Sequence, residues 1–399
     1  MSNSKKGVLN YLSEFSIPLI LGVIIALIFA NVDHHAYEKL IETPLVSPDI
    51  FQIFGHKVNF HFLINDIFMV FFFGIAAVEI TQSVVLGGSL NPISRAINPL
   101  LGTLGGVLGP IAFFFFFGFL FNVDSTVYKG WGIPTATDIA LAWLVARMVF
   151  GSKHPAVSFL LLLAVADDAI GLGIIAIAYP TQAVVLPWLG LTLVGMAFSF
   201  VLRKTGIKNF WPYLIFGGIL SWLGLLLAHL HPALALVFIV PFMPTDQTHG
   251  KHGPLFTDDE HDHSTLVGFE HFFKFPVDFG LLGFGLANAG VLAGGIGSVT
   301  WVVFLALLVG KTVGIYLFSF IGTKIGFALP EGMNKKELGL AGVVAGLGLT
   351  VALFVAGQAY KGSGEEALMG AAKMGALFSG FIALIAIIFG KVIGIKKRN

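Results

Sequence analysis

Apolar residues run along this chain in long blocks separated by short polar segments. The blocks are roughly 17–25 residues long, the length of an α-helix that crosses a bilayer. They predict an all-α integral membrane protein with about twelve transmembrane helices. Both termini are expected in the cytoplasm, because that topology places most of the 23 lysines and arginines on the cytoplasmic side. The expected spans are 17–32, 63–87, 100–121, 131–147, 156–179, 183–202, 211–230, 231–243, 275–292, 301–321, 338–359 and 371–393.

Two polar excursions lie between these spans, and neither divides the chain, so we expect 1–399 to be a single polytopic transporter domain. Residues 34–62 form the extracytoplasmic excursion, in which alternating residues around Gly55 predict a small β-hairpin. An isolated hairpin is marginal in water, so 50–62 is expected to pair with its copy in a homodimer. Residues 245–274 predict a cytoplasmic loop rich in histidine and acid, either a pH sensor at the mouth of a transporter or a plain solvated loop.

The amino-acid composition narrows the possible classes of protein. Hydrophobic residues make up 56% of the chain and charged residues 11%, and the mean hydropathy is +0.89. The chain has no cysteine, which excludes disulfides and thiolate metal sites. A net charge of +1 gives no basic face for nucleic acid. No cofactor is expected, and the lipid bilayer is the expected surrounding.

Two of the spans carry signs of interruption. Proline removes a backbone donor, and clustered glycines weaken a helix, so each signal predicts a local break. Broken helices in two halves of a membrane chain are typical of inverted-repeat transporters with a site at the midplane. A proline kink and a glycine packing stripe are the alternatives. The residues concerned are Pro134, Thr137 and Asp138 in the first span, and Gly346, Gly348 and Thr350 in the second.

Charged residues inside the apolar blocks indicate an ion or proton site. Asp167 and Asp168 interrupt one block and Lys311 another, and each such charge costs at least about 2.5 kcal/mol on insertion scales unless it has partners. Neighbouring helical residues point about 100° apart, so one aspartate can line an ion path while the other reaches Lys311. A proton and a hard cation compete for the same carboxylate oxygens, and that competition produces exchange.

A few further polar residues extend this pattern. Glu79 lies toward one end of its span and is expected to line a funnel, and Glu270 and His271 stand beside the span at 275–292. Asn288 lies within that span, where an interhelical hydrogen bond is the better interpretation.

Together these residues resemble the NhaA-type sodium/proton antiporters, and the likeness runs from about residue 17 to the C-terminus. The matching motifs are Thr137-Asp138 to the family's broken fourth helix, Asp167-Asp168 to its paired aspartates, Gly310-Lys311 to its tenth-helix lysine, Gly346-Leu347-Gly348-Leu349-Thr350 to its unwound eleventh helix, Ala287-Asn288-Ala289-Gly290 to its ninth, and Glu270-His271 to its funnel pair.

The resemblance implies a mechanism that spacing alone does not give. Asp168 would be the principal Na⁺ ligand with Asp167 beside it, while Asp138 and Lys311 would compensate the dipole ends of two crossed half-helices. Exchange would be electrogenic, bringing protons in and taking Na⁺ or Li⁺ out of a bacterium across its plasma (inner) membrane, for pH and sodium homeostasis. The expected pH-sensing or funnel residues are Glu79, Glu270, His271 and His231.

The sequence departs from the family pattern in three places. Ile80-Thr81-Gln82-Ser83 follows Glu79 where the family usually has basic and acidic residues, the glycine after the aspartate pair is displaced to Gly171, and Pro232 follows His231. These departures bear on pH regulation and ion preference and leave the core site intact.

Three rival functions remain open from the sequence. A sodium-coupled organic-anion symporter of the bile-acid transporter type would need a larger, more polar cavity. An intramembrane aspartyl protease using Asp138 and Asp167 is disfavoured, because no Gly-x-Gly precedes either aspartate and Lys311 has no role in that chemistry. A non-transporting sensor would differ only in flux. The favoured interpretation is that the protein is a transporter and not an enzyme.

Overall fold

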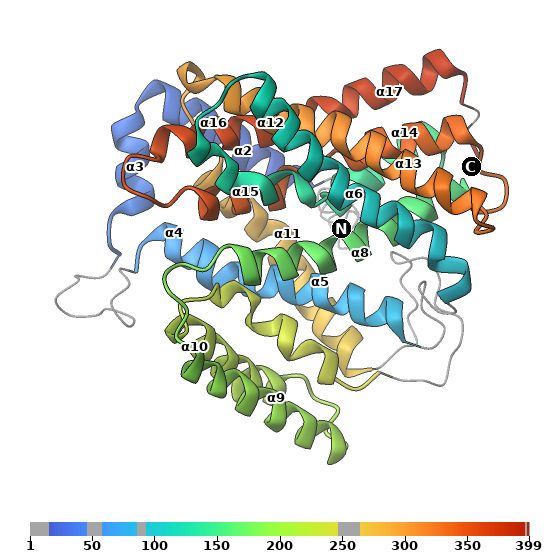
Figure 1. Cartoon of the computed structure of the whole chain (residues 1–399). Helices are drawn as coiled ribbons and strands as arrows, with labels where there is room; N and C mark the ends of the chain where they lie inside the picture. The colour runs from blue at the N-terminus through green and yellow to red at the C-terminus, as the bar shows by residue number, and fades with distance from the viewer. Residues whose placement is uncertain (1–15, 46–57, 86–92, 246–263, 396, 399) are drawn as a thin grey trace, which may run out of the picture. The chain divides into compact units, whose positions relative to one another are not determined.

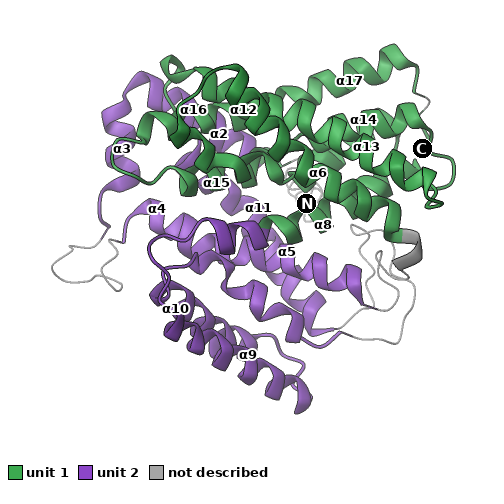
Figure 2. Ribbon diagram, in the orientation of Figure 1, with its two compact units in different colours: residues 1–17, 89–171, 291–399 green, residues 18–88, 172–290 purple. Residues whose placement is uncertain are grey.

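The structure is a computed structural model, and it describes residues 16–45, 58–85, 93–245, 264–395 and 397–398 (Figure 1). Helices are the regular elements of these residues, apart from one isolated bridge between Pro44 and Asn59. They form two compact units, each assembled from separate stretches of the chain (Figure 2). Whether the chain acts as a single transporter domain stays a prediction.

Unit 1 comprises residues 1–17, 89–171 and 291–399, and it holds both interrupted spans. Its elements are α6 (Ile93–Leu120), η2 (Ser125–Thr135), α7 (Ile139–Phe150), most of α8 (Pro155–Ala178), η7 (Ala293–Gly295), α12 (Ser298–Leu305), η8 (Ala306–Gly310), α13 (Lys311–Lys324), α14 (Lys335–Ala345), α15 (Leu349–Ala359), α16 (Glu366–Phe378) and α17 (Phe381–Ile393).

Glycines let α6 and α13 pack backbone to backbone. A methyl group on Gly109 would lie 2.8 Å from Gly314 Cα, and one on Gly310 would lie 2.7 Å from Pro110 Cα. No side chain larger than hydrogen fits such a contact without moving the backbone. This close approach fixes the segment of α13 that begins with Lys311.

Unit 2 comprises residues 18–88 and 172–290. Its elements are α2 (Ile17–Val32), α3 (His34–Glu42), α4 (Phe60–Phe62), η1 (Leu63–Phe68), α5 (Met69–Val84), η3 (Leu186–Trp188), α9 (Leu189–Lys204), η4 (Tyr213–Gly218), α10 (Ile219–Leu227), η5 (Pro232–Phe238), η6 (Val240–Phe242) and α11 (Thr265–Asn288). The predicted interhelical bond of Asn288 is present, because its Nδ2 donates to Asn65 Oδ1 over 3.0 Å.

The described residues support six to eight membrane spans. Six helical stretches are long and apolar enough to cross a bilayer, and two bent helix pairs raise the number to eight. Three shorter apolar helices coincide with expected spans at 17–32, 211–230 and 231–243, and α11 covers the one at 275–292. The all-helical class is therefore confirmed, while the count of twelve and the inverted repeat stay predictions.

The hairpin expected at 50–62 is not seen. Its turn and first strand lie outside the described residues, but Phe60–Phe62 is the first turn of a helix that continues to Val84. Asn59 causes this, because its side chain accepts a 2.8 Å hydrogen bond from Phe62 N and so caps the helix N-terminus. The alternation in the second strand was too short to outweigh that cap.

The loop expected at 245–274 ends ten residues early. Ser264 caps α11, its side chain accepting from Val267 N over 3.3 Å, so Glu270 and His271 lie on a helix. Leu266, Phe269 and Phe273 repeat at three- and four-residue spacing and are buried, which explains why the polar stretch is helical. The histidine cluster at 249–263 lies outside the described residues.

Candidate ion-binding site

Both predicted interruptions are present in unit 1. The first separates η2 from α7 with a bend of 58°, and the second separates α14 from α15 with a bend of 47°. Pro134 lies in the last turn of η2, directly before the unwound residues. The two breaks touch each other, because Asp138 N donates a 2.6 Å hydrogen bond to Leu347 O. Two unwound backbones thus meet at one point.

Asp138 serves the N-termini of two half-helices at once. Its Oδ1 accepts from Leu141 N over 3.1 Å at the start of α7. Its Oδ2 accepts from Thr350 N over 3.3 Å and from Thr350 Oγ1 over 2.9 Å at the start of α15. The side chain is buried, and a carboxylate in this position is stabilised by the positive ends of both helix dipoles.

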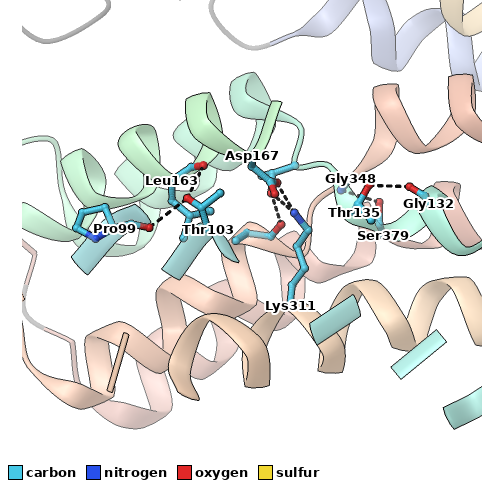
Figure 3. A network of polar contacts seen from close by, with 11 residues as sticks. Pro99, Thr103, Gly132, Thr135, Leu163, Asp167, Lys311, Gly348 and Ser379 are labelled. Atoms are coloured by element: carbon cyan, nitrogen blue, oxygen red, sulfur yellow. Dashed lines mark hydrogen bonds and ion pairs between the residues drawn. The ribbon is translucent and has the colours of Figure 1, made fainter. Parts of the chain in front are cut away.

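The second break depends on glycine. A methyl group on Gly346 would lie 2.8 Å from Leu307 O, and one on Gly348 would lie 2.9 Å from Ala136 O. Both positions therefore need hydrogen as the side chain. Gly348 N donates over 3.3 Å to Ser379 Oγ, which in turn donates to Ala376 O over 2.6 Å (Figure 3).

A buried ion pair joins α13 to α8 beside the first break. Lys311 Nζ hydrogen-bonds to Asp167 Oδ2, and both side chains are fully buried (Figure 3). Lys311 Nζ also donates to Thr137 Oγ1 over 2.7 Å. The expectation that one of the paired aspartates reaches Lys311 is confirmed, and that aspartate is Asp167.

The Thr137 hydroxyl connects this pair to the second break. Its Oγ1 lies 2.8 Å from Asp167 Oδ2 and 2.9 Å from Ala345 O at the end of α14. Asp138 lies at helix N-termini, as the resemblance implied. Among the described residues Lys311 contacts Thr137 and Asp167, and the Thr137 hydroxyl connects it to Ala345 O at the carbonyl end of α14.

Asp167 and Asp168 lie in different surroundings. Asp167 is completely buried, whereas Asp168 keeps partial exposure, as expected for adjacent residues about 100° apart on a helix. The Oδ1 atom of Asp167 is also buried, and it accepts no hydrogen bond from any residue that the structure describes. Carboxylate and hydroxyl oxygens are the ligands that hard cations prefer. Among the described residues no group of three His, Asp or Glu side chains forms a multidentate metal site.

The expected funnel residues lie in unit 2. Glu270 Oε2 on α11 accepts from Gln82 Nε2 on α5 over 3.2 Å, so the departure at Gln82 contacts the funnel pair directly. Glu79 lies within electrostatic range of Glu270, and His271 is exposed. His231 is buried, and its Nε2 hydrogen-bonds to Tyr179 O over 2.5 Å. Glu79 and Glu270 therefore lie near each other while His231 binds a backbone carbonyl, and a part in a funnel or in pH sensing stays a prediction for all of these residues.

Two residues of unit 1 escaped the sequence analysis. Ser379 is a lone hydroxyl before Gly380 in an apolar run, and nothing in the pattern marks it as a contact of the second break. Lys373 lies near the start of the span expected at 371–393 and was not singled out, yet it is buried within the helical stretch Glu366–Ile393. The signal that could have identified it is its position among alanines and glycines, since a lysine in an apolar small-residue segment is a candidate for burial.

These features define a polytopic membrane protein of the transporter class, with buried charges where two broken helices meet. The sequence model of the Na+/H+ antiporter 1 family matches residues 8–392, and the chain belongs to that family.

Curated relatives agree with this assignment. The chain is 57% identical to the Na(+)/H(+) antiporter NhaA of Desulfitobacterium hafniense, covering 100% of this chain and 98% of that protein. It is 55% identical to NhaA 2 of Pelobacter propionicus and 52% identical to NhaA of Geobacter sulfurreducens, each over 98% of both chains. The sodium proton antiporter MjNhaP1 of Methanocaldococcus jannaschii aligns with 94% of this chain and 98% of that chain, at 17% identity and a TM-score of 0.49. The assignment to the family does not rest on that likeness.

Proposed function

We propose that this protein exports sodium or lithium ions in exchange for protons. The observation that carries the proposal is the buried pair of Asp167 and Lys311, held by Thr137 beside Asp168 at the meeting of the two breaks. Family membership supports the same reaction. The names of the relatives describe antiporters, which are transporters and not enzymes, and the organic-anion symporter is accordingly not favoured.

Each residue has a separate part in this exchange. Asp168, being partly exposed, binds the cation as it enters, and Asp167 supplies its buried Oδ1 from the adjacent position. A cation that takes over Asp167 displaces the ammonium of Lys311, and a proton can take over the same oxygens. The site is thus neutralised by either ion but not by both, which couples the two fluxes.

Asp138, Thr350 and the glycines position the site. Asp138 holds the starts of α7 and α15, while Gly346 and Gly348 let the second break approach Leu307 and Ala136. The reaction needs no cofactor, because the ions are themselves the cargo. If more protons enter than cations leave, the membrane potential contributes about 2.3 kcal/mol per charge per 100 mV.

The surroundings of the protein complete the proposal. The apolar helices belong to an integral membrane protein, and its bacterial relatives support the plasma (inner) membrane as its location. Both termini lie in the cytoplasm in the proposed topology, because the lysine and arginine distribution favours it. We also propose a homodimer through 50–62.

Flux through reconstituted protein tests the proposed exchange. Liposomes with an imposed pH gradient receive Na⁺, Li⁺ or K⁺ while lumenal pH is followed, for wild type, Asp168→Asn and the control Asp124→Asn. Asp124 is a helix-capping aspartate on an exposed segment of unit 1. Collapse of the gradient by Na⁺ or Li⁺ in wild type and Asp124→Asn, with no response from Asp168→Asn, supports antiport through Asp168. If no cation moves protons between about pH 6 and pH 9, which brackets shifted carboxylates, the antiporter function is rejected.

A further inference from the structure

Lys373 is a buried lysine with no carboxylate partner among the residues that the structure describes. It lies on α16 within a helical stretch long and apolar enough to cross a membrane, and only 8% of its surface is exposed. None of the residues that the structure describes places a carboxylate oxygen within 4.0 Å of its ammonium group. A buried ammonium group is costly to remove from water unless a negative group lies close to it. Some other negative group must therefore offset its charge.

The packing of α16 shows where Lys373 points. On one face of α16, Ala371 O accepts from Thr300 Oγ1 over 2.9 Å, and a methyl on Gly375 would lie 2.6 Å from Thr300 O, so this face lies against α12. Lys373 stands about 200° around the helix from both residues. Its side chain accordingly lies along α15, where a methyl on Gly357 would be 3.7 Å from Lys373 Cε and 4.0 Å from Nζ.

Gly357 belongs to the last turn of α15, whose carbonyl groups have no partners within the helix. These carbonyls carry the negative end of the helix dipole, worth roughly half an elementary charge. Gln358, on the same turn, adds a buried Oε1 atom that accepts no hydrogen bond from the described residues. The C-terminal end of α15 therefore places negative groups beside the Lys373 side chain.

α15 is short, with 11 residues and a length of about 16 Å. Its N-terminus binds Asp138 through Thr350, and its C-terminus faces Lys373. α16 contacts both ends, because Ser379, directly after it, accepts from Gly348 N. The half-helix is thus held at one end by an anion and at the other by a cation.

We propose that Lys373 is a positioning residue for the cation site, acting through α15 on Thr350 and Asp138. This inference rests on the proposed exchange function. Without the ammonium group, the last turn of α15 loses its counter-charge and the half-helix is no longer fixed along its axis. Asp138 then loses its fixed contacts with Thr350, and the cation site is less well ordered when the ion arrives.

The test compares Lys373→Met, Lys373→Arg and Lys391→Met in proteoliposomes. Sodium is titrated against collapse of the pH gradient, and the half-saturating concentration is separated from the maximal rate per folded protein. Lys391 is the matched control, because it is exposed near the end of α17 in the same apolar stretch. We expect Lys373→Met to raise the half-saturating sodium concentration roughly three- to thirtyfold, the range of such charge–dipole contacts. Lys373→Arg, which keeps the charge, should restore most of the affinity, and Lys391→Met should match wild type.

A different pattern would overturn the proposal. If Lys373→Met lowers only the melting temperature and the amount of folded protein, with unchanged half-saturation, Lys373 is merely structural. Should that variant fail to fold, Lys373→Gln, neutral but polar, takes its place with the same expected result. A wild-type protein without a sodium response rejects the exchange function itself, whereas a normal wild type with an unaltered Lys373 variant rejects this inference alone.

Discussion

The two interrupted helices of unit 1 break in different ways. The first break carries its chemistry in side chains, with Thr137 on the ion pair and Asp138 on two helix starts. The second break has glycines at the corresponding place, and the absence of side chains there lets its backbone approach Leu307 and Ala136 closely. The first break therefore supplies the charged and polar side chains, and the second supplies a backbone that packs closely against them. Two bends of similar size, 58° and 47°, thus contribute different groups to one site.

The largest loss of stability is expected from removing the Lys311 ammonium group beside the first break. Lys311→Met leaves the fully buried Asp167 without its counter-charge, so we expect the free energy of unfolding in detergent to fall by about 3–5 kcal/mol. The double variant Lys311→Met with Asp167→Leu removes both charges and should recover much of that loss. Equal stability of the single and double variants would show that the pair is not coupled.

Removing Asp138 should cause the next largest loss of stability. Asp138→Ala leaves Leu141 N and Thr350 N without their acceptor, which costs roughly 2–4 kcal/mol for two buried donors. Thermal unfolding measures the loss. Asp124→Ala is the control, because it removes a cap from an exposed helix start and should change the melting temperature much less. Similar losses in both variants would contradict the double role of Asp138.

A smaller effect is expected at the glycine break. Gly348→Ala brings a methyl to 2.8 Å from Leu307 Cδ2 and 2.9 Å from Ala136 O, so the two breaks must separate, at a cost of roughly 1–3 kcal/mol. Gly339→Ala, on α14, meets nothing nearer than 3.8 Å and should be neutral or slightly stabilising. The melting temperatures of the two variants test this prediction. A Gly348→Ala protein as stable as Gly339→Ala would contradict the close approach of Gly348 to Leu307 and Ala136.

The smallest effect on stability is expected from a surface link between η2 and the residue that precedes α16. Lys129 Nζ, on η2, lies 2.6 Å from Glu365 Oε1, and this hydrogen bond holds the pKa of Glu365 below its usual value. The contact therefore adds stability at neutral pH and loses it as pH falls through the lowered pKa. Melting curves from about pH 7 to pH 3, which spans ordinary glutamate values, should show wild type and Glu365→Gln converging in acid. A constant difference would assign the effect to something other than this charge.

The breaks and the buried charges were predictable because a membrane sequence is mostly apolar. In such a background Pro134, the paired aspartates and Lys311 stand out, and each has few physical explanations. Which aspartate meets Lys311 was not predictable, since it depends on how α8 is rotated against α13. That rotation is set by packing, including the contact of α13 with α6, and not by local pattern.

Two helix starts were not predicted, because the local sequence at each resembles a strand or a loop. The residues before Phe62 alternate like a strand, yet Asn59 caps a helix there. The acidic and histidine-rich stretch predicted a loop as far as residue 274, although the Ser264 side chain caps the N-terminus of α11. Ser379 and the partner of Lys373 depend on contacts across the fold, which no single segment records.

The Thr137 hydroxyl has one hydrogen and two acceptors within reach, Asp167 Oδ2 and Ala345 O. It can satisfy only one of them at a time, so the two acceptors share a single proton in alternation. In the proposed exchange, an ion bound to Asp167 would take that oxygen out of the competition, and the hydrogen would then turn to Ala345 O at the end of α14. Rotation of this one hydroxyl therefore decides whether Thr137, in the first break, is hydrogen-bonded to Asp167 on α8 or to Ala345 beside the second break.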